Sequence, residues 1–384
     1  MAFLTLDAEK LKSNYTYLND LFSKKSIEWA VVTKLLCGNK TFLQEVLALD
    51  LKQVCDSRVT NLKMVKSIAP EVETVYIKPP PKRSIEGVVR YADISMNTEM
   101  QTIRLLSEEA KRQNKQHKVI IMIEMGELRE GILGENLLRF YENVFQFSNI
   151  TVVGVGTNLN CMYGVLPSHD KLIQLSLYTQ LIEAKFNTEI QYISGGSSVT
   201  IPLIFEDLLP KAINHFRVGE TLFLGTDVYH DTPFPKMYPD VFRLYAEVIE
   251  ITKKTGVPVG KLGTNLKGES MEFEHQDRSQ RSFRAILDLG LLDMDEKHVH
   301  LKDSSLEIVG ASSDMIVVDL GDNPNNIKVG DLLECEMDYM GLLRIMNSKY
   351  IEKRVVHEKL LDIPESNIAA AGHTLHKHKT LAQE

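Results

Sequence analysis

Short apolar runs recur along the first two thirds of the chain, and each is followed by a stretch with helical spacing and polar capping residues. Eight such runs are present, at 28–33, 53–55, 74–77, 92–96, 119–124, 152–157, 191–194 and 213–218. Two of them, EWAVVT and KVIIMIE, are almost continuously apolar, which is typical of parallel strands buried on both faces. Strands that alternate with helices predict an α/β fold, and eight repeats are the number that a closed (βα)8 TIM-type barrel requires.

The alternation stops after Asp240. The chain continues with strand-like pieces separated by Gly, Pro and Asn, namely LYAEVIEIT, RAILDLG, EIVGAS, MIVVDLG and DLLECEM. No helical pattern intervenes, so these pieces predict a second, smaller and mainly-β domain. At the other end of the chain a short strand is expected at 3–6, and Asp7 is placed to cap a helix that runs through Leu11 and Leu18.

These boundaries divide the chain into three parts. We expect the barrel at 8–235, the β domain at 1–7 with 236–369, and a mobile tail at 370–384. The tail has little apolar surface to bury. Its histidines, His373, His376 and His378, could bind a metal, but a solvated tail is the favoured interpretation, and no metal site is expected.

Charge and leader segments narrow the range of partners. The net charge is −8 with a pI of about 5.8, which argues against nucleic acid and anionic membranes because both require clustered Lys and Arg. The N-terminal stretch MAFLTLDAEKLKSNY has acidic residues where a signal peptide is basic and then apolar, and no apolar run is long enough to span a bilayer. We therefore expect a cytoplasmic protein with a small-molecule ligand.

The four cysteines, Cys37, Cys55, Cys161 and Cys335, lie far apart. They form neither metal-type pairs nor a dense disulfide framework. Reduced thiols in the cytoplasm fit this pattern.

Lys34 is the first candidate catalytic residue. It follows the first apolar run and therefore stands at the C-terminal rim of a barrel strand, where active sites of this fold lie. Burial and nearby cations can lower the pKa of such a lysine and leave a nucleophilic amine for Schiff-base chemistry. A surface lysine at a strand end is the alternative.

Two later rim segments have the composition of an anion site. SGGSSVT follows the seventh run and offers the hydroxyls of Ser197 and Ser198 beside flexible glycine backbone. FRVGETLFLG follows the eighth run and supplies Arg217 and Gly219. Barrels that bind phosphate commonly do so in the loops after strands seven and eight, although either loop alone could be a plain turn.

The fifth and sixth runs add polar groups to the same mouth. Arg129 lies just beyond the fifth run and could bind a carboxylate in a bidentate manner. The alternative is a surface ion pair with Glu127 or Glu130. Asn158 and Cys161 follow the sixth run. Asn158 could instead be a turn residue, and an isolated cysteine is often a small buried side chain.

In this order and spacing, the segments resemble the fold-type III pyridoxal phosphate enzymes, the alanine racemase family, and most closely its ornithine racemase-like branch. AVVTKLLCG is similar to the lysine segment of that family, and MGELREGI, GVGTNLNC, ISGGSS and FRVGETLFLG follow in its order. In the second domain, GASSDMIVVDLGD is similar to the serine-methionine-aspartate segment and DYMGLLRIMNSKYIEK to the closing tyrosine segment. The resemblance covers nearly the whole chain.

The resemblance implies pyridoxal 5'-phosphate as the cofactor and a role for each matching residue. Lys34 would form the Schiff base and act as one acid/base, and Arg217 would contact the pyridine nitrogen. The phosphate would be held by four neighbouring positions: Ser198, Ser197, Gly219 and Glu220. Arg129 would approach the cofactor O3′ or the substrate carboxylate, with Asn158 near the ring.

The second domain would complete the site of a partner subunit in a head-to-tail homodimer. The backbone of Ser313 and Asp314 would face the substrate carboxylate, and Tyr339 would complete the phosphate or substrate site. For the second base that racemisation requires, we consider Tyr339, Cys161 and Tyr163, in that order.

Three departures from alanine racemases bear on the substrate. Gly38 stands where those enzymes carry a phosphate-binding tyrosine, Met122 stands at their modified lysine, and 257–277 lacks their catalytic tyrosine. We therefore expect a racemase for ornithine or another basic amino acid rather than alanine. An aldolase or decarboxylase on the same fold and a non-catalytic pyridoxal phosphate carrier are the alternatives.

Overall fold

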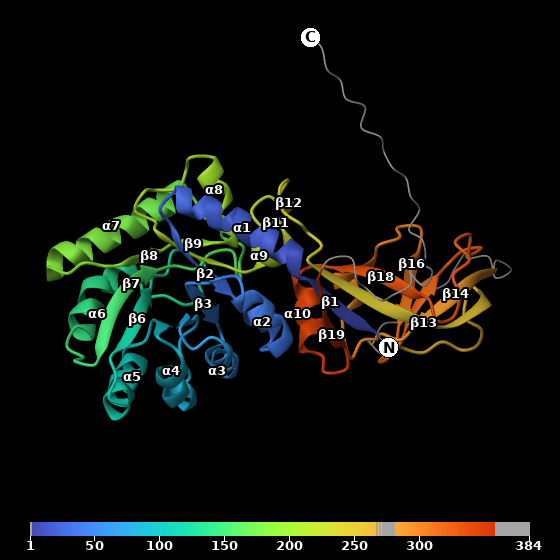
Figure 1. Cartoon of the computed structure of the whole chain (residues 1–384), viewed down its shortest axis with the longest axis horizontal. Coiled ribbons are helices and arrows are strands. Elements are labelled where there is room, and N and C mark those ends of the chain that lie inside the picture. The colour runs from blue at the N-terminus through green and yellow to red at the C-terminus, as the bar shows by residue number, and fades with distance from the viewer. Residues whose placement is uncertain (1, 266–267, 269, 271–280, 358–384) are drawn as a thin grey trace, which may run out of the picture. The chain divides into compact units, whose positions relative to one another are not determined.

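The computed structural model describes residues 2–265, 268, 270 and 281–357 (Figure 1). The chain divides into two compact units, one of Asp7–Val241 and one that combines Met1–Leu6 with Phe242–Glu384. The expected tail at 370–384 lies outside the described residues.

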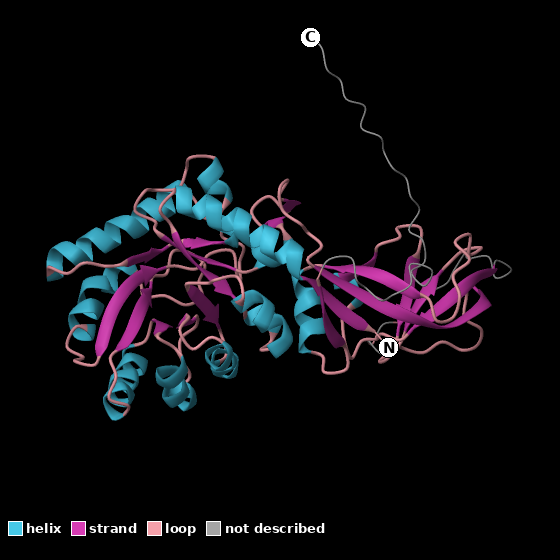
Figure 2. Cartoon of the chain, in the orientation of Figure 1, coloured by secondary structure: helices cyan, strands magenta, loops and turns pink. Residues whose placement is uncertain are grey.

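The first unit is a barrel of parallel strands surrounded by helices (Figure 2). Its strands are β2 (Glu28–Val32), β3 (Gln53–Asp56), β4 (Glu73–Tyr76), β5 (Ile94–Asn97), β6 (His117–Met122), β7 (Ile150–Gly156), β8 (Tyr192–Ser194), β9 (Gly196–Ser197) and β10 (His215–Val218). Every predicted run overlaps one of these strands, so the predicted (βα)8 barrel is confirmed. The two-residue β9 was not predicted.

The sheet closes through the β8–β9 segment. Its strand order runs from β8 through β7, β6, β5, β4, β3, β2 and β10 to β9. A single residue, Gly195, separates β8 from β9, so the chain itself joins the two ends of the sheet. This crossing requires glycine, because a Cβ atom on Gly196 would lie 2.2 Å from the ring of Phe216 on β10.

The helices lie outside the strands. They are α1 (Ala8–Lys24), α2 (Lys40–Leu47), α3 (Val59–Ile68), α4 (Ile85–Tyr91), α5 (Met100–Arg112), α6 (Leu137–Val144), α7 (His169–Phe186), α8 (Pro202–Phe205) and α9 (Glu220–Leu224). Asp7 caps α1 as expected, and its side chain accepts from Lys10 N at 3.0 Å. A hydrophobic cluster in the barrel interior includes small and branched side chains such as Ala30, Val75 and Ile120.

The second unit is built on an antiparallel sheet. Its strands follow the order β15 (Val299–Leu301), β18 (Leu332–Met337), β13 (Phe242–Thr255), β14 (Arg281–Leu287), β17 (Ile316–Asp319) and β16 (Glu307–Ala311), and β1 (Phe3–Asp7) pairs with β13 and β19 (Glu352–Val356). All five predicted pieces form strands, and the mainly-β second domain is confirmed.

A helix that was not predicted follows the last of these pieces. α10 (Tyr339–Asn347) forms because Asp338 accepts from Gly341 N at 2.9 Å and so caps its first turn. Leu342, Ile345 and Met346 then pack its apolar face into the unit. Across the described parts of the chain, no helix is both long and apolar enough to cross a membrane.

Candidate active site at the barrel mouth

Lys34 stands at the end of β2, as predicted. It begins a short 3-10 turn (Lys34–Leu36), and its side chain is exposed, whereas Leu35 and Leu36 are buried and anchor the turn. Thr33, the residue before it, donates its hydroxyl to the buried carboxylate of Asp56 at 3.0 Å. The position of Lys34 is therefore fixed on both sides by buried contacts.

The loop after β10 lies against the end of β2. In the parallel register Arg217 faces Ala30 and Val218 faces Val31. A Cβ atom on Gly219 would lie 3.1 Å from the Val32 Cβ atom and from the Val32 carbonyl oxygen. Since Lys34 follows Val32 by two residues, the structure brings the lysine turn and the Gly219 loop together.

The serine loop after β9 joins the same place. Ser197 pairs in register with Arg217 and caps the short turn Ser198–Thr200. The Ser198 hydroxyl accepts from Thr221 N at 3.3 Å, which ties this loop to the start of α9 beside Glu220. The four residues predicted for a phosphate therefore gather in two joined loops.

Arg217 lies buried between these loops, with 8% of its surface exposed. Its Nη1 donates to Ser194 O at 3.0 Å and also to Ser194 Oγ, and its Nη2 donates to Thr157 O at 2.7 Å. Among the residues that the structure describes, no carboxylate lies within ion-pair distance of it. Burial lowers the pKa of Arg217, and neutral oxygens rather than an anion hold its guanidinium in place.

The loops after β6 and β7 meet through Glu130. The Arg129 Nε atom lies 2.6 Å from Glu130 Oε2, so the surface ion pair considered for Arg129 is present. Asn158 Nδ2 donates to Glu130 Oε1 at 3.4 Å and to Cys161 Sγ at 3.2 Å. Cys161 is exposed rather than buried. Glu130, Cys161 and Arg129 all act electrostatically on Arg217, so both loops belong to the same mouth.

The role of Glu127 was not predicted from the sequence. Its side chain is 1% exposed and accepts five backbone N–H groups, at 2.5–3.1 Å, from the loop after β7: those of Asn160, Cys161, Met162, Tyr163 and Val165. Burial alone would raise the pKa of Glu127, but hydrogen bonds from these amides outweigh it and hold the pKa at about 2. A charged carboxylate therefore shapes the loop that carries Cys161.

The remaining candidates, Ser313, Asp314 and Tyr339, belong to the second unit. Leu292 N donates to Ser313 O at 2.8 Å, and a Cβ atom on Gly290 would lie 2.4 Å from the Asp314 backbone. The Ser313–Asp314 turn therefore packs directly on the segment that begins at Gly290. Tyr339 is the first residue of α10.

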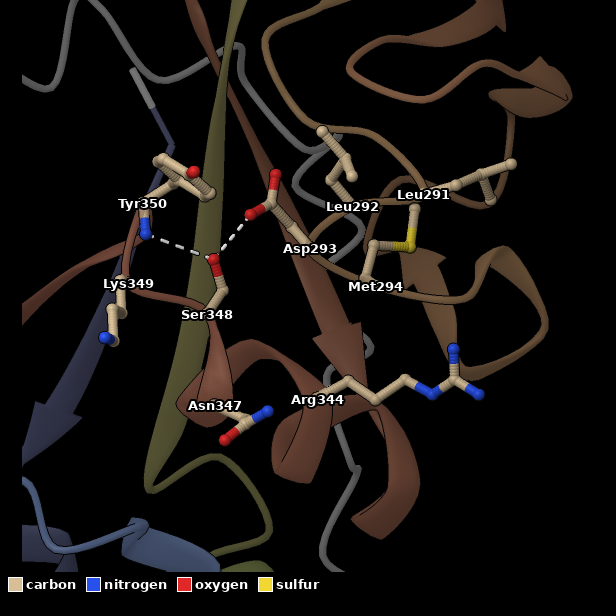
Figure 3. Close-up of a pocket in the computed structure, with 9 residues that line it drawn as sticks. All are labelled: Leu291, Leu292, Asp293, Met294, Arg344, Asn347, Ser348, Lys349 and Tyr350. Atoms are coloured by element: carbon tan, nitrogen blue, oxygen red, sulfur yellow. Dashed lines mark hydrogen bonds between the residues drawn. The ribbon is translucent and has the colours of Figure 1, made fainter.

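The same segment and the far end of α10 line a pocket of about 550 Å³ (Figure 3). Its lining residues are Leu291, Leu292, Asp293, Met294, Arg344, Asn347, Ser348, Lys349 and Tyr350. Ser348 Oγ donates to Asp293 Oδ1 at 2.5 Å and accepts from Tyr350 N at 3.2 Å. These bonds tie the turn after β14 to the loop after α10. Within the described ranges, no three side chains are grouped as metal ligands.

Comparisons with known proteins agree with this arrangement. The family model described as alanine racemase, N-terminal domain, matches residues 6–227. An ornithine racemase from Acetoanaerobium sticklandii is 36% identical over 354 residues, which cover 92% of this chain and 99% of that protein. A lysine racemase from Thermotoga maritima is 29% identical over 350 residues, covering 91% and 97%. Among solved structures, an alanine racemase from Bartonella henselae with covalently bound pyridoxal phosphate has a TM-score of 0.71 at 18% identity, covering 92% and 99%.

Proposed function

Because the chain belongs to the alanine racemase family, we propose that it is a pyridoxal-phosphate-dependent racemase of a basic amino acid, with ornithine as the first candidate. The observation that carries this function is the meeting of Lys34, the serine loop and Arg217 at neighbouring strand ends. The ornithine and lysine racemases among the relatives support a basic substrate.

The donor groups at the mouth fit pyridoxal phosphate. Phosphate is bound by hydroxyl and backbone N–H donors, and the joined loops supply the hydroxyls of Ser197 and Ser198 and the amides of Gly219 and Glu220. Lys34 is the amine for the cofactor aldehyde. When bound, the cofactor supplies an acceptor for the electron pair that remains on Cα after proton removal.

Arg217 is assigned to the ring nitrogen of the cofactor. Its guanidinium is buried and hydrogen-bonded to neutral oxygens, and among the described residues no carboxylate lies within ion-pair distance of it. A guanidinium donates a hydrogen bond without giving up its proton.

Racemisation needs a proton removed from one face of Cα and returned to the other. We assign Lys34 to one face. For the other face we keep Tyr339, then Cys161 and Tyr163. Tyr339 would act from the second unit of a partner copy in a head-to-tail homodimer, together with the backbone of Ser313 and Asp314.

Arg129 is assigned to the substrate and the cofactor, and Asn158 is assigned to the cofactor. Arg129 gives its Nε atom to Glu130, and we assign its Nη atoms to the substrate carboxylate or the cofactor O3′. Asn158, held by Glu130 and Cys161, would pack near the ring. All four cysteines are free thiols, which supports a reducing compartment such as the cytoplasm.

The test uses single enantiomers of ornithine and lysine in D₂O with the cofactor-loaded protein. We expect deuterium at Cα and loss of optical activity, together with a visible absorbance band from lysine-linked cofactor. Lys34→Ala should abolish the band and lower the rate by about 10³-fold or more. Lys40→Ala, at an exposed lysine six residues away, is the matched control.

Two results would contradict this function. One is the absence of Cα exchange with every basic amino acid, and the other is an unchanged band in Lys34→Ala. Release of CO₂ or cleavage of the Cα–Cβ bond would assign a decarboxylase or an aldolase instead.

A further inference from the structure

A continuous chain of polar side chains crosses the barrel interior beneath Arg217. Ser194 Oγ lies 2.6 Å from His215 Nδ1, and His215 Nε2 lies 2.9 Å from Gln53 Oε1. Gln53 Nε2 donates to Glu73 Oε2 at 2.8 Å, and Glu73 Oε1 is 2.8 Å from Lys118 Nζ. With the bond from Arg217 to Ser194, the chain runs unbroken from the barrel mouth to an ion pair.

The ion pair lies at the opposite end of the barrel. Glu73 is the first residue of β4, and Lys118 is the second residue of β6. The N-terminal ends of parallel strands meet at one edge, away from the mouth where their C-terminal ends gather. There Glu73 and Lys118 line an open polar pocket of about 440 Å³.

The middle of the chain is closed off from water. Ser194 is 0%, His215 1% and Gln53 6% exposed. The ring of Tyr192 lies against the His215 imidazole, with centroids 4.7 Å apart. Buried polar groups must satisfy one another, and an unpaired one is costly. Apart from a hydrogen bond between Gln53 and the Tyr192 hydroxyl, the side-chain partners of Ser194, His215 and Gln53 in the described part of the structure are members of this chain.

Donor and acceptor chemistry gives the chain a single direction. Arginine only donates, so Ser194 Oγ accepts from Arg217. At the other end the Glu73 carboxylate only accepts, so Gln53 turns its NH₂ group to Glu73 and its carbonyl oxygen to His215. His215 must then carry its proton on Nε2.

His215 is neutral, because burial and the charge of Arg217 hold its pKa at about 3. Its Nδ1 atom therefore accepts, and the Ser194 hydroxyl donates to it. The hydroxyl hydrogen of Ser194 therefore points away from Arg217, and the lone pairs of Ser194 Oγ point towards the guanidinium. The guanidinium meets acceptors at both Ser194 Oγ and Ser194 O.

We propose that Ser194, His215 and Gln53 are positioning residues that form a one-way hydrogen-bond chain, in which the Glu73 carboxylate at one end of the barrel fixes the orientation of Arg217 at the other. The contacts themselves do not depend on the proposed function. Only the assignment of Arg217 to the cofactor ring rests on it.

The first test reads the protonation of His215 directly. In full-length protein with ¹⁵N-labelled histidine at neutral pH, we expect Nε2 to be protonated and Nδ1 unprotonated, with the signals identified by their loss in His215→Asn. Glu73→Gln replaces the obligate acceptor by an amide whose carbonyl oxygen stays with Lys118, so its NH₂ group faces Gln53. Gln53 is then free to flip, and a population with protonated Nδ1 should appear.

Lys118→Met is the matched control. It removes the same ion pair but leaves the Glu73 carboxylate as acceptor, so the Nε2-protonated form should persist. Protonated Nδ1 in the wild type would overturn the proposed direction. An unchanged spectrum in Glu73→Gln would overturn the role of Glu73. Both readings need no cofactor and stand even if the protein proves not to be a racemase.

The second test measures Arg217 in the loaded protein. Ser194→Ala should shift the visible band of the bound cofactor and lower kcat about tenfold with KM within about twofold. Ser194→Thr retains the hydroxyl and should restore both. A Ser194→Ala protein that is less stable but has an unmoved band and kcat would show that Ser194 serves packing alone and would refute its positioning role.

Discussion

Replacing Glu127 by glutamine should release the loop after β7. The two carboxylate oxygens divide their five amide partners, since Oε1 accepts from three of them and Oε2 from Asn160 and Val165. Glutamine has one carbonyl oxygen, and its NH₂ group would face amides that also donate. At least two partly buried N–H groups would therefore lose their acceptor, in addition to the lost charge.

The free energy lost in Glu127→Gln can be worked out in two ways. An unsatisfied buried N–H costs about 1–3 kcal/mol. Because these amides are only partly buried, about 1–2 kcal/mol applies to each, and two give about 2–4 kcal/mol. The fall in the pKa of Glu127 from 4.5 to about 2 corresponds to at most about 3 kcal/mol of linked stability. Because Met162 and Tyr163 on the same loop are more than half exposed, solvent screening reduces this electrostatic part to about 1–2 kcal/mol.

Amide hydrogen exchange measures the effect where it occurs. We expect the amides of the loop after β7 to exchange about 30- to 1,000-fold faster in Glu127→Gln, which is the same free energy expressed as an equilibrium constant. Glu124→Gln is the control, because Glu124 accepts from the amides of Gly126, Leu128 and Arg129 instead. Unchanged amide exchange in Glu127→Gln would refute the role of Glu127 in holding the loop after β7.

The pH dependence has a defined sign. The folded pKa of Glu127 is depressed from its ordinary value of 4.5, so its contribution is fully present above about pH 4.5 and is lost as pH falls through about 2. Loop protection in the wild type should decline across this window. Glu127→Gln should show no such decline, and parallel pH profiles for the two proteins would contradict the assignment.

Two further substitutions test the barrel. Gly196→Ala places a Cβ atom 2.2 Å from the Phe216 ring and should destabilise the protein by about 3 kcal/mol or more. The control is Gly310→Ala, whose Cβ atom would have nothing within 4 Å and which should leave the melting temperature nearly unchanged. Equal melting temperatures for the two variants would mean that the β9 crossing relaxes. Asn14→Ala removes three hydrogen bonds of a buried side chain, two of them to the Tyr238 backbone, and should lower the urea midpoint by an amount equivalent to about 2–4 kcal/mol. A change below about 0.5 kcal/mol would show that water replaces the amide.

The barrel strands could be predicted because their signal is local. Each run of buried residues is visible within a few positions, and parallel strands covered on both faces need no partner information to be recognised. Helix α1 shows where this stops. Leu11 and Leu18 were expected on its buried face, but Asn14 is also buried there because it bonds to Leu222 and Tyr238, more than 200 residues away. The spacing of residues along a helix does not predict a partner so far away in the sequence.

The candidate site divides in the same way. Lys34, Ser198 and Arg217 could be found because each lies at or just after the end of a recognisable strand, and strand ends of one barrel share a mouth. Glu127 could not be found, because in MGELREGI it reads as one surface charge among several. Its partners begin 33 residues further on, and a carboxylate is rarely buried without such partners.

Ser194 and His215 show that even correct placement leaves chemistry undecided. Both lie in predicted strands, but a buried histidine has two neutral forms, and its immediate contacts allow either of them. Ser194 can donate or accept, and the amide of Gln53 can turn either way. Only the ends of the chain, an arginine that must donate and a carboxylate that must accept, remove the ambiguity. The orientation of a group at the barrel mouth is thus determined by a carboxylate at the far edge of the sheet, a dependence that exists only once the strands have closed around it.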